Sequence, residues 1–460
     1  MKSGENVTPV LADFVAAARF EHLPAAAIHE AKRLLLDSIG CALAGLTSAK
    51  GRLAVRLAQR LGGTEESVIW GTRGSVSAAH AAFANGELIN ALDWDAGGVP
   101  PGHSTPCVIP ACFALGETCN ASGQDLLLAI ALGHEISGRL GGVLTGLEEW
   151  TADSAVAQLP PVHGYSLHAI GAAAAAARIL GLGPTETAWA FGIGAYFAPV
   201  PAMVKWYKTV PAAMTKYGST GWIAQAGVTA ALLAQSGYSG DTTVLDGEHG
   251  FWRFCASAHE KWQPGKLLEG LGQRWLLGQP YSIFYKHYPF CGLCHVEMDE
   301  FLDIVRTQAL RPEEIDSVRI LCDPLIEEPI WVSTNLQTHV DAQFSVPFIF
   351  AVAAHGIGIG AQWQNETLLH DERIRAFMPK VTMGTHPAGL HRIEVRARGQ
   401  CYEAECEARM PVMSDAQLIT KFEQNAALHL PSPAANRILK LVLELETLAE
   451  ITELARCLEI

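Results

Sequence analysis

Residues 169–182 read AIGAAAAAARILGL, and this most apolar run of the chain decides the fold class. Alanine has the highest helix propensity of all residues, and its small side chain lets helices pack closely. A charge, Arg178, interrupts the run, which argues against a membrane span or a signal peptide. The stretch therefore predicts a buried helix inside a helix-rich protein.

Helical periodicity extends outward from this run, from Pro9 to about Ser257. One helix is predicted with Pro24 in its first turn and Gly45 just beyond its end. Three more are predicted from Ser77 to Ala91, from Pro184 onward and from Trp222 to Gln235. The first half of the chain is thus expected to be all-helical.

The pattern changes further along the chain. Residues 317–323 alternate apolar and polar side chains, which favours a β-strand, and residues 392–408 alternate on both sides of Gly399, which predicts a hairpin. Helical periodicity returns after Met413. We therefore expect a mainly α protein with a large all-helical domain formed by both termini (residues 1–269 and 413–460) and a smaller inserted α+β lid domain (residues 270–412). Active sites favour such a domain junction.

Composition narrows the classes of partner. The 460 residues carry a formal net charge of -14, with no block of clustered Lys or Arg. A nucleic acid or an anionic membrane is therefore not expected as a partner. The eleven cysteines are scattered and odd in number, and no export segment is recognisable, so we expect reduced thiols and a cytoplasmic location.

Residues 91–106 give the strongest indication of chemistry. Asp93 and Asp95 follow the end of a predicted helix, where the helix dipole disfavours negative charge by up to about 1 kcal/mol, and His103 follows across glycines and prolines. These acids need a compensating partner or a function, and with His103 they could supply a base, an acid and an orienting group. A solvated surface pair is the alternative, and a magnesium–diphosphate site lacks a second acidic cluster.

Two further segments carry titratable groups just ahead of predicted helices. Lys216 and Tyr217 open residues 216–221, which do not match a phosphate-binding loop, but Lys216 and the following helix amides could hold a carboxylate. His163 lies before the alanine-rich helix, and histidine is the commonest general acid or base. Each of these side chains could instead have only a structural role.

Residues 286–295 place Lys286 and His287 just before a Cys291–Cys294–His295 spacing. This spacing matches covalent haem attachment, which belongs to exported proteins, and a zinc site would need a second suitable pair. An iron–sulfur cluster using Cys291, Cys294 and a distant thiolate such as Cys322 stays open. More commonly, two cysteines at this spacing are small buried residues in a tight turn.

Several ordered segments together resemble the MmgE/PrpD family, which includes 2-methylcitrate dehydratase, cis-aconitate decarboxylase and iminodisuccinate epimerase. The resemblance covers essentially the whole chain. The segments are Leu35–Cys41, Ala82–Gly86, Ala91–Asp93, Gly133–Ile136, His163, Lys216 with Gly221 and Gly227, Asp246–Phe251, Lys286–Cys291 and Ala342–Phe348.

The resemblance implies a helical domain with a lid domain, a homodimer and a site that needs no metal or other cofactor. Its catalytic segments correspond to Asp93, His103, His163 and Lys216 here. It also implies substrate-binding positions, among which Cys291 stands where some members carry histidine and Phe348 where some carry tyrosine. These positions are Asp95, Tyr217, Lys286, His287, Cys291 and Phe348.

Departures from the family pattern concern the substrate. Where many members read Asp-Asp-Thr-His, residues 95–98 read Asp-Ala-Gly-Gly, and Ser219 stands in place of a histidine. The segment 206–211 ahead of Lys216 is also unusual. We expect a related reaction on a different and less charged substrate, although a binding protein without catalysis is an alternative.

The known reactions of the family centre on a carbon next to a carboxylate. We expect Lys216 and His103 to bind the carboxylate of a small carboxylic acid, while His163 and Asp93 exchange protons with it. The sequence therefore predicts a metal-independent lyase, with dehydration favoured over decarboxylation. An epimerase or isomerase using the same proton abstraction, or an iron–sulfur dehydratase using Cys291 and Cys294, is the alternative.

Overall fold

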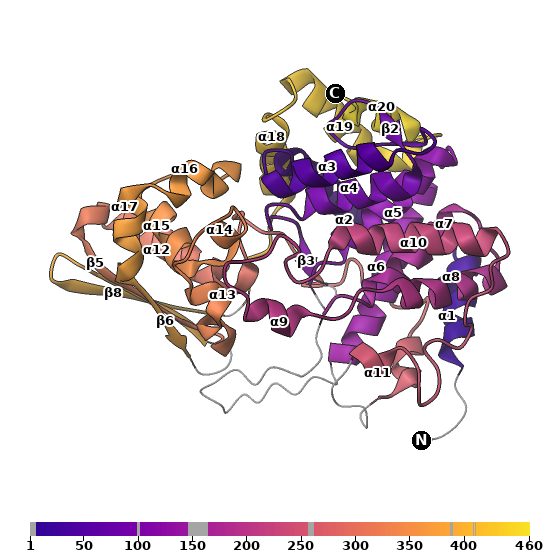
Figure 1. The fold of residues 1–460 in the computed structure, drawn as a ribbon, viewed down its shortest axis with the longest axis horizontal. Helices are drawn as coiled ribbons and strands as arrows, with labels where there is room; N and C mark the ends of the chain where they lie inside the picture. The colour runs from indigo at the N-terminus through magenta and orange to yellow at the C-terminus, as the bar shows by residue number, and fades with distance from the viewer. Residues whose placement is uncertain are drawn as a thin grey trace.

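The computed structural model describes residues 6–98, 102–145, 164–255, 262–386, 390–407, 409 and 411–460. The described part is mainly helical with only small sheets, as the alanine-rich sequence predicted. Figure 1 shows helices from the two ends of the chain side by side, with α18–α20 next to α2–α5. All eleven cysteines are free thiols.

The larger helices of the first half and the C-terminal helices share one hydrophobic core. Two short strands, β1 (Ser67–Val68) and β2 (Ser75–Val76), form a ribbon beside them. The helices are α1 (Val7–Ala17), α2 (Ala25–Gly45), α3 (Ala49–Leu61), α4 (Ala78–Ile89), α5 (Thr105–Thr118), α6 (Gly123–Thr145), α7 (His168–Ile179), α8 (Pro184–Phe197), α10 (Thr220–Gln235), α11 (Trp252–Cys255), α18 (Asp415–Ala426), α19 (Ser432–Leu443) and α20 (Thr452–Leu458).

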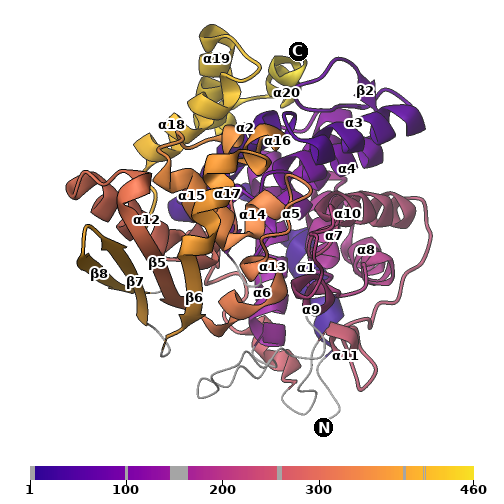
Figure 2. The ribbon, with the colours of Figure 1, turned by 60° about the vertical axis from the view of Figure 1, so that its left-hand side comes forward.

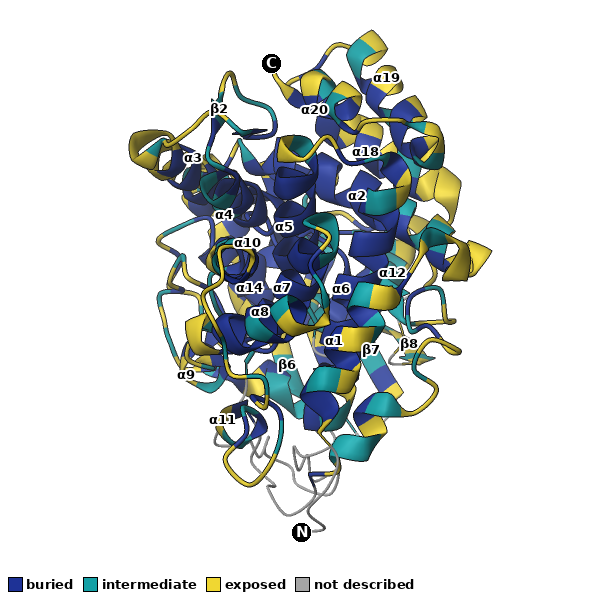
Figure 3. Ribbon diagram, turned by 90° about the vertical axis from the view of Figure 1, so that its right-hand side faces the viewer, coloured by how far each residue is buried: buried dark blue, intermediate teal, exposed yellow. Residues whose placement is uncertain are grey.

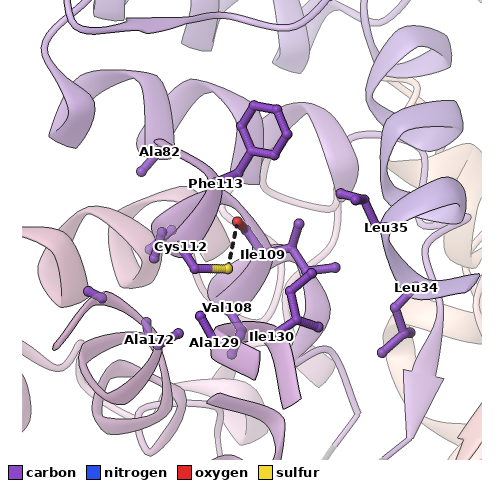
Figure 4. Packing of buried hydrophobic residues seen from close by; sticks show 14 of the residues in the cluster. Leu34, Leu35, Ala82, Val108, Ile109, Cys112, Phe113, Ala129, Ile130 and Ala172 are labelled. Carbon is purple, nitrogen blue, oxygen red and sulfur yellow. Dashed lines mark hydrogen bonds between the residues drawn. The ribbon is translucent and has the colours of Figure 1, made fainter. Parts of the chain in front are cut away.

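The alanine-rich run forms α7 at the centre of this core, where α5, α6, α8 and α10 pack around it. Figure 3 shows α5 and α7 mainly in the colour of buried residues. Small side chains make the close approach possible, because a Cβ on Gly227 of α10 would lie 2.5 Å from the Cβ of Ala172. Figure 4 shows Ile109, Cys112 and Phe113 of α5 among their apolar neighbours in the same core.

Within the described residues, α6 is the one helix that is long and apolar enough to cross a membrane. Its most apolar 18-residue window is 89% buried inside the protein, as expected for a core helix. The helix also carries Glu135 and Arg139, which pair with each other at 2.6 Å. Burial by neighbouring helices therefore accounts for its composition.

Most predicted helix boundaries are confirmed, including Pro184 at the start of α8 and Gly237, with a φ of 86°, just beyond α10. The expectation for Gly45 was wrong, because Gly45 is the last residue of α2 and not its terminator. A Cβ there would lie 2.2 Å from the carbonyl oxygen of Leu88 in α4. The glycine is therefore needed for the close crossing of α2 and α4.

A second hydrophobic core contains a four-stranded sheet and several helices from residues 288–404, joined by α9 (Met203–Tyr207). The sheet has the order β6-β5-β7-β8, in which β5 and β6 are parallel and the other pairs antiparallel. Figure 2 shows α12, α15 and α17 beside it. Its elements are α12 (His295–Thr307), β5 (Ile315–Cys322), α13 (Pro329–Val332), α14 (Asp341–Phe344), α15 (Val346–Ala354), α16 (Glu366–Leu369), α17 (Glu372–Phe377), β6 (Val381–Thr385), β7 (Leu390–Ala397) and β8 (Gln400–Glu407).

The predicted strand and hairpin are confirmed as β5 and as β7 with β8. Arg392 lies opposite Glu405 in the hairpin and pairs with the neighbouring Glu403. The division at residues 269/270 and 412/413 stays a prediction. One finding refines it, since α9 and Tyr217 pack in the second core although they precede residue 270. The two parts of the chain are connected by the antiparallel pair of β3 (Gly97–Gly98) with β4 (Ile283–Phe284).

Candidate active site

Asp93 lies at the centre of a buried charge cluster just beyond α4. Its Oδ1 accepts from Nζ of Lys216 at 2.5 Å, and its Oδ2 accepts from Nζ of Lys286 at 2.6 Å. Asp93 and Lys216 both have left-handed backbones, with φ of 55° and 52°, which costs about 1–2 kcal/mol per residue. Two strained residues that meet in one ion pair indicate a functional site.

The charges in the cluster shift one another's pKa. Burial raises the pKa of Asp93, but the nearby charges of Lys216, Lys286 and His103 outweigh it and hold this pKa well below its usual range. Burial lowers the pKa of Lys216 to about 8, against the opposing attraction of Asp93. For Lys286, burial lowers the pKa, but the attraction of Asp93 and Asp95 outweighs it and the pKa is raised. Lys216 is therefore the lysine that titrates nearest to neutrality.

His103 is oriented by Asp95. Its Nδ1 donates to Oδ2 of Asp95 at 2.6 Å, which leaves Nε2 at 4.0 Å from Oδ1 of Asp93. The imidazole stacks on the ring of Tyr217, with centroids 4.8 Å apart and an interplanar angle of 18°. A carboxylate on one ring nitrogen leaves the other nitrogen available for proton transfer.

Asn90 connects the two carboxylates, and the sequence analysis missed it. Its Nδ2 donates to Oδ1 of Asp95 at 3.0 Å and to the hydroxyl of Tyr217 at 2.5 Å, and that hydroxyl donates to Oδ1 of Asp93 at 2.9 Å. Its carbonyl accepts from Lys216 at 2.9 Å. An amide in an otherwise apolar helix end was the one sequence feature that could have indicated it.

The start of α10 is occupied by a carboxylate of the protein itself. The amide of Gly221 and the hydroxyl of Ser219 donate to Oε1 of Glu87 at 2.9 and 2.5 Å, and Lys50 pairs with Oε2 at 3.0 Å. We expected these helix amides to help Lys216 hold a substrate carboxylate. Glu87 fills that position instead, so this expectation is corrected.

A second buried pair supports the loop that carries the two aspartates. Lys421 of α18 donates to Oδ1 of Asp37 and to the carbonyl of Trp94, each at 2.7 Å. The amide of Ala96 donates to Oδ2 of Asp37 at 3.0 Å. Nothing in the local sequence linked Lys421 to this loop, because the contact joins residues 384 positions apart.

The glycines at 97 and 98 are required by packing against the opposite strand. A Cβ on Gly97 would lie 2.2 Å from Cζ of Phe284, and one on Gly98 would lie 2.3 Å from the carbonyl oxygen of Ser282. Gly98 also has a φ of 121°, which residues with a Cβ rarely adopt. The departure from the family pattern at these positions therefore leaves no side chain that could reach a substrate.

Six of the predicted site residues meet in this cluster, namely Asp93, Asp95, His103, Lys216, Tyr217 and Lys286. Cys291 lies beside it, since burial and the charge of Asp93 raise the pKa of its thiol while Lys286 opposes them. His287 and Phe348 do not join the cluster. His287 lines a separate cavity of about 410 Å³ with Trp94 and Lys421, and Phe348 is buried in the second core. His163 lies outside the described residues.

The described residues contain no group of three or more His, Cys, Asp or Glu side chains that could hold a metal ion. Burial raises the pKa of Cys294 well above its usual range, with the charge of Glu297 adding to it. Burial also raises the pKa of Cys322. The described residues therefore offer no set of three such ligands for the iron–sulfur alternative.

The sequence matches two family models over most of its length. Residues 10–263 match the MmgE/PrpD N-terminal domain, and residues 288–447 match the MmgE/PrpD C-terminal domain. These ranges include Asp93, His103 and Lys216 in the first match and Cys291 in the second.

Curated relatives carry the name of a decarboxylase. Human cis-aconitate decarboxylase is 27% identical over 480 residues, covering 99% of this chain and 95% of the relative. A cis-aconitate decarboxylase-like protein from Aspergillus oryzae is 25% identical over 98% of this chain and 96% of its own length. Mouse cis-aconitate decarboxylase is 29% identical over 62% of this chain and 56% of its own length. With both of its family models matched, the chain belongs to the MmgE/PrpD family.

Proposed function

We propose that this chain is a lyase that moves a proton at a carbon next to a carboxylate of a small carboxylic acid. The observation that carries the proposal is the position of His103, oriented by Asp95 and lying beside the lysines that flank Asp93. A proton-transfer group and fixed positive charge are what the removal or delivery of such a proton requires.

In this proposal, His103 exchanges the proton through Nε2. The sequence analysis gave that role to Asp93, but the low pKa of Asp93, caused by its two lysines and His103 against the effect of burial, makes its carboxylate a weak base. Asp93 instead holds the two ammonium groups in place. His163, which the sequence analysis also chose, stays our candidate for a second proton-transfer group.

Lys216 and Lys286 bind the substrate carboxylate and stabilise the charge that develops on it. An ammonium group has three donors, and the described contacts use two of them on each lysine. One N–H of each lysine is therefore available for the substrate. Fixed donors of this kind contribute about 3–4 kcal/mol each to stabilising a developing anion, so two ammonium groups supply positive charge without requiring a metal ion.

The names of the relatives favour decarboxylation as the outcome. The bond to the leaving carboxylate breaks, its electron pair passes into the retained carboxylate and the conjugated system, and His103 delivers a proton to the carbon. In dehydration, which we favoured from the sequence, His103 would take the carbon-bound proton and the C–H electron pair would form the new double bond. The C–O bond would break, and the leaving hydroxyl would take a proton from a second acid, for which His163 is our candidate, and leave as water. Both outcomes use His103 for a proton transfer at carbon, as the donor in decarboxylation and as the base in dehydration.

Proton NMR of the chelator-treated protein in deuterated water tests this function, with a panel of hydroxy and unsaturated mono-, di- and tricarboxylates. We expect deuterium next to a carboxylate, together with released carbon dioxide or a new alkene. The H103Q variant should lose about two orders of magnitude of this rate, whereas H355Q, which changes a histidine outside the cluster, should retain it. Wild-type rates in H103Q, or activity only after metal is restored, would refute the proposal.

A further inference from the structure

Aromatic rings cover one side of the charge cluster. The ring centroid of Trp206, in α9, lies 5.3 Å from that of Tyr217 and 4.7 Å from that of Phe344. The ring centroids of Tyr207 and Trp331 lie 5.1 Å apart. All five side chains are buried, and the unusual segment 206–211 begins within α9.

This aromatic wall adjoins the reacting groups directly. Nζ of Lys216 lies 5.1 Å from the ring centroid of Tyr217 and 5.6 Å from that of Phe344. The charges of Asp93 and Lys286 also act on the thiol of Cys291, which contacts Trp331 of the same wall. A ligand held by the two lysines would therefore lie against these rings.

The indole of Trp206 carries an N–H that needs an acceptor. Its Nε1 is buried, and no hydrogen-bond partner for it lies among the described residues. Buried indole N–H groups normally have a partner. Four other indoles also lack one among the described residues, those of Trp70, Trp262, Trp275 and Trp331. Trp206 is the one in ring contact with Tyr217 beside Lys216, so its donor is the one placed to meet a ligand oxygen.

The charges of the cluster limit how many carboxylates it can accept. Lys216 and Lys286 are balanced by Asp93 and Asp95, so protonation of His103 provides one net positive charge. Lys50, the next cation, is already paired with Glu87. The undescribed residues 99–101 and 146–163 contain no Lys or Arg. One substrate carboxylate is thus compensated, whereas three would leave buried negative charge without a partner.

Resting on the dehydration route of the function proposed above, which needs a single carboxylate, we infer that the substrate is a hydroxy monocarboxylic acid with a planar apolar body, whose hydroxyl is its uncharged oxygen. The carboxylate binds to Lys216 and Lys286, and the apolar body packs against Trp206, Tyr207 and Trp331. The uncharged oxygen accepts from the indole of Trp206. Gly97 and Gly98, which offer no polar side chain, fit the same substrate class.

Calorimetric titration of the full-length protein tests this inference with 3-phenyllactate as the monocarboxylate and cis-aconitate as the tricarboxylate. Wild-type protein is used, because protonated His103 supplies the charge that compensates the substrate carboxylate, and proton NMR reports any turnover during the titration. We expect phenyllactate to bind at least about tenfold more tightly. W206F keeps a ring but removes the N–H, and should weaken phenyllactate binding about fivefold or more. W222F changes an exposed indole and should leave it unchanged.

Tighter binding of cis-aconitate, binding of neither acid, or an unchanged affinity in W206F would overturn the inference. Different results would refute the proposed lyase function. If phenyllactate binds as expected but wild-type protein catalyses no deuterium exchange with any acid of the panel, the substrate class stands and the lyase function does not. If cis-aconitate is preferred and exchanged, the lyase function stands and the inference on substrate class is wrong.

Discussion

At the scale of single residues, the Asp93 carboxylate holds two buried ammonium groups together. D93N removes this charge while keeping the shape of the side chain, and leaves Lys216 and Lys286 without their closest partner. Breaking a buried ion pair on one side costs about 3–5 kcal/mol, so we expect that loss in the free energy of unfolding measured with urea. D303N breaks an exposed pair with Arg306 and should cost less than about 1 kcal/mol. Equal losses of unfolding free energy in D93N and D303N would contradict the role of Asp93 as the partner of both lysines.

We expect Lys216 to set the alkaline limit of activity. Burial lowers its pKa to about 8, so the ammonium form that binds a carboxylate is lost as the pH rises through this value. We therefore expect kcat/KM to fall about tenfold per pH unit above the pKa. In K216R the guanidinium remains protonated, and the fall should move to higher pH even if the maximal rate is lower. An alkaline limit at the same pH in K216R would assign the titration to another group.

The predicted site residues that meet in the cluster are those whose chemistry is unusual for their position. Asp93 and Asp95 stood at a helix end that disfavours negative charge, and Lys216 stood in a stretch with few charges. Asn90 and Lys421 could not be predicted, because an amide or a lysine within a helix has many ordinary explanations. Their roles depend on contacts with residues far away in the sequence, such as Tyr217 and Asp37.

At the scale of elements, the pair of β3 and β4 shapes the loop between Asp95 and His103. A Cβ on Gly97 would meet the ring of Phe284 at 2.2 Å, so G97A should force the two strands apart. Overpacking of this kind costs about 1–3 kcal/mol, and turnover should fall because Asp95 moves relative to His103. Adding F284A should restore much of both losses. G142A places a methyl group where nothing lies within 4 Å, and should be neutral in urea unfolding and activity.

The strands also show which elements a sequence pattern can predict and which it cannot. Alternating residues predicted β5, β7 and β8. In the structure β5 and β7 carry buried residues, whereas β8 alternates half-buried with exposed ones. Two-residue strands such as β3 and β4 have no period to detect, and β3 is made of two glycines. The aromatic residues of α9 pack in the second core, a long-range contact that no local period predicts. Local periodicity therefore predicted the scaffold better than the walls of the site.

At the scale of the whole molecule, the two ends of the chain meet beneath the candidate active site. Asp37 lies in α2 near the N-terminus, Lys421 lies in α18 near the C-terminus, and both bind the loop of residues 94–96. Burial raises the pKa of Asp37, and Lys421 offsets part of this effect. The ion pair therefore links the packing of α2 against α18 to the position of Asp93 and Asp95.

K421M removes the ammonium group but keeps the length of the apolar chain. We expect the free energy of unfolding to fall by about 3–5 kcal/mol, because Asp37 stays buried without its cation. Turnover should fall at least about tenfold, because the Trp94 carbonyl loses its donor and the loop shifts relative to His103.

A double-mutant cycle measured by urea unfolding and by turnover tests this coupling. D37N with K421M should lose less stability than the sum of the single variants, because the second change removes a charge that the first left unpaired. K440M alters an exposed lysine on the neighbouring α19 and should change neither stability nor turnover measurably. Additive losses in the cycle would mean that Asp37 and Lys421 act independently, and an unchanged turnover in K421M would mean that the loop is held without them.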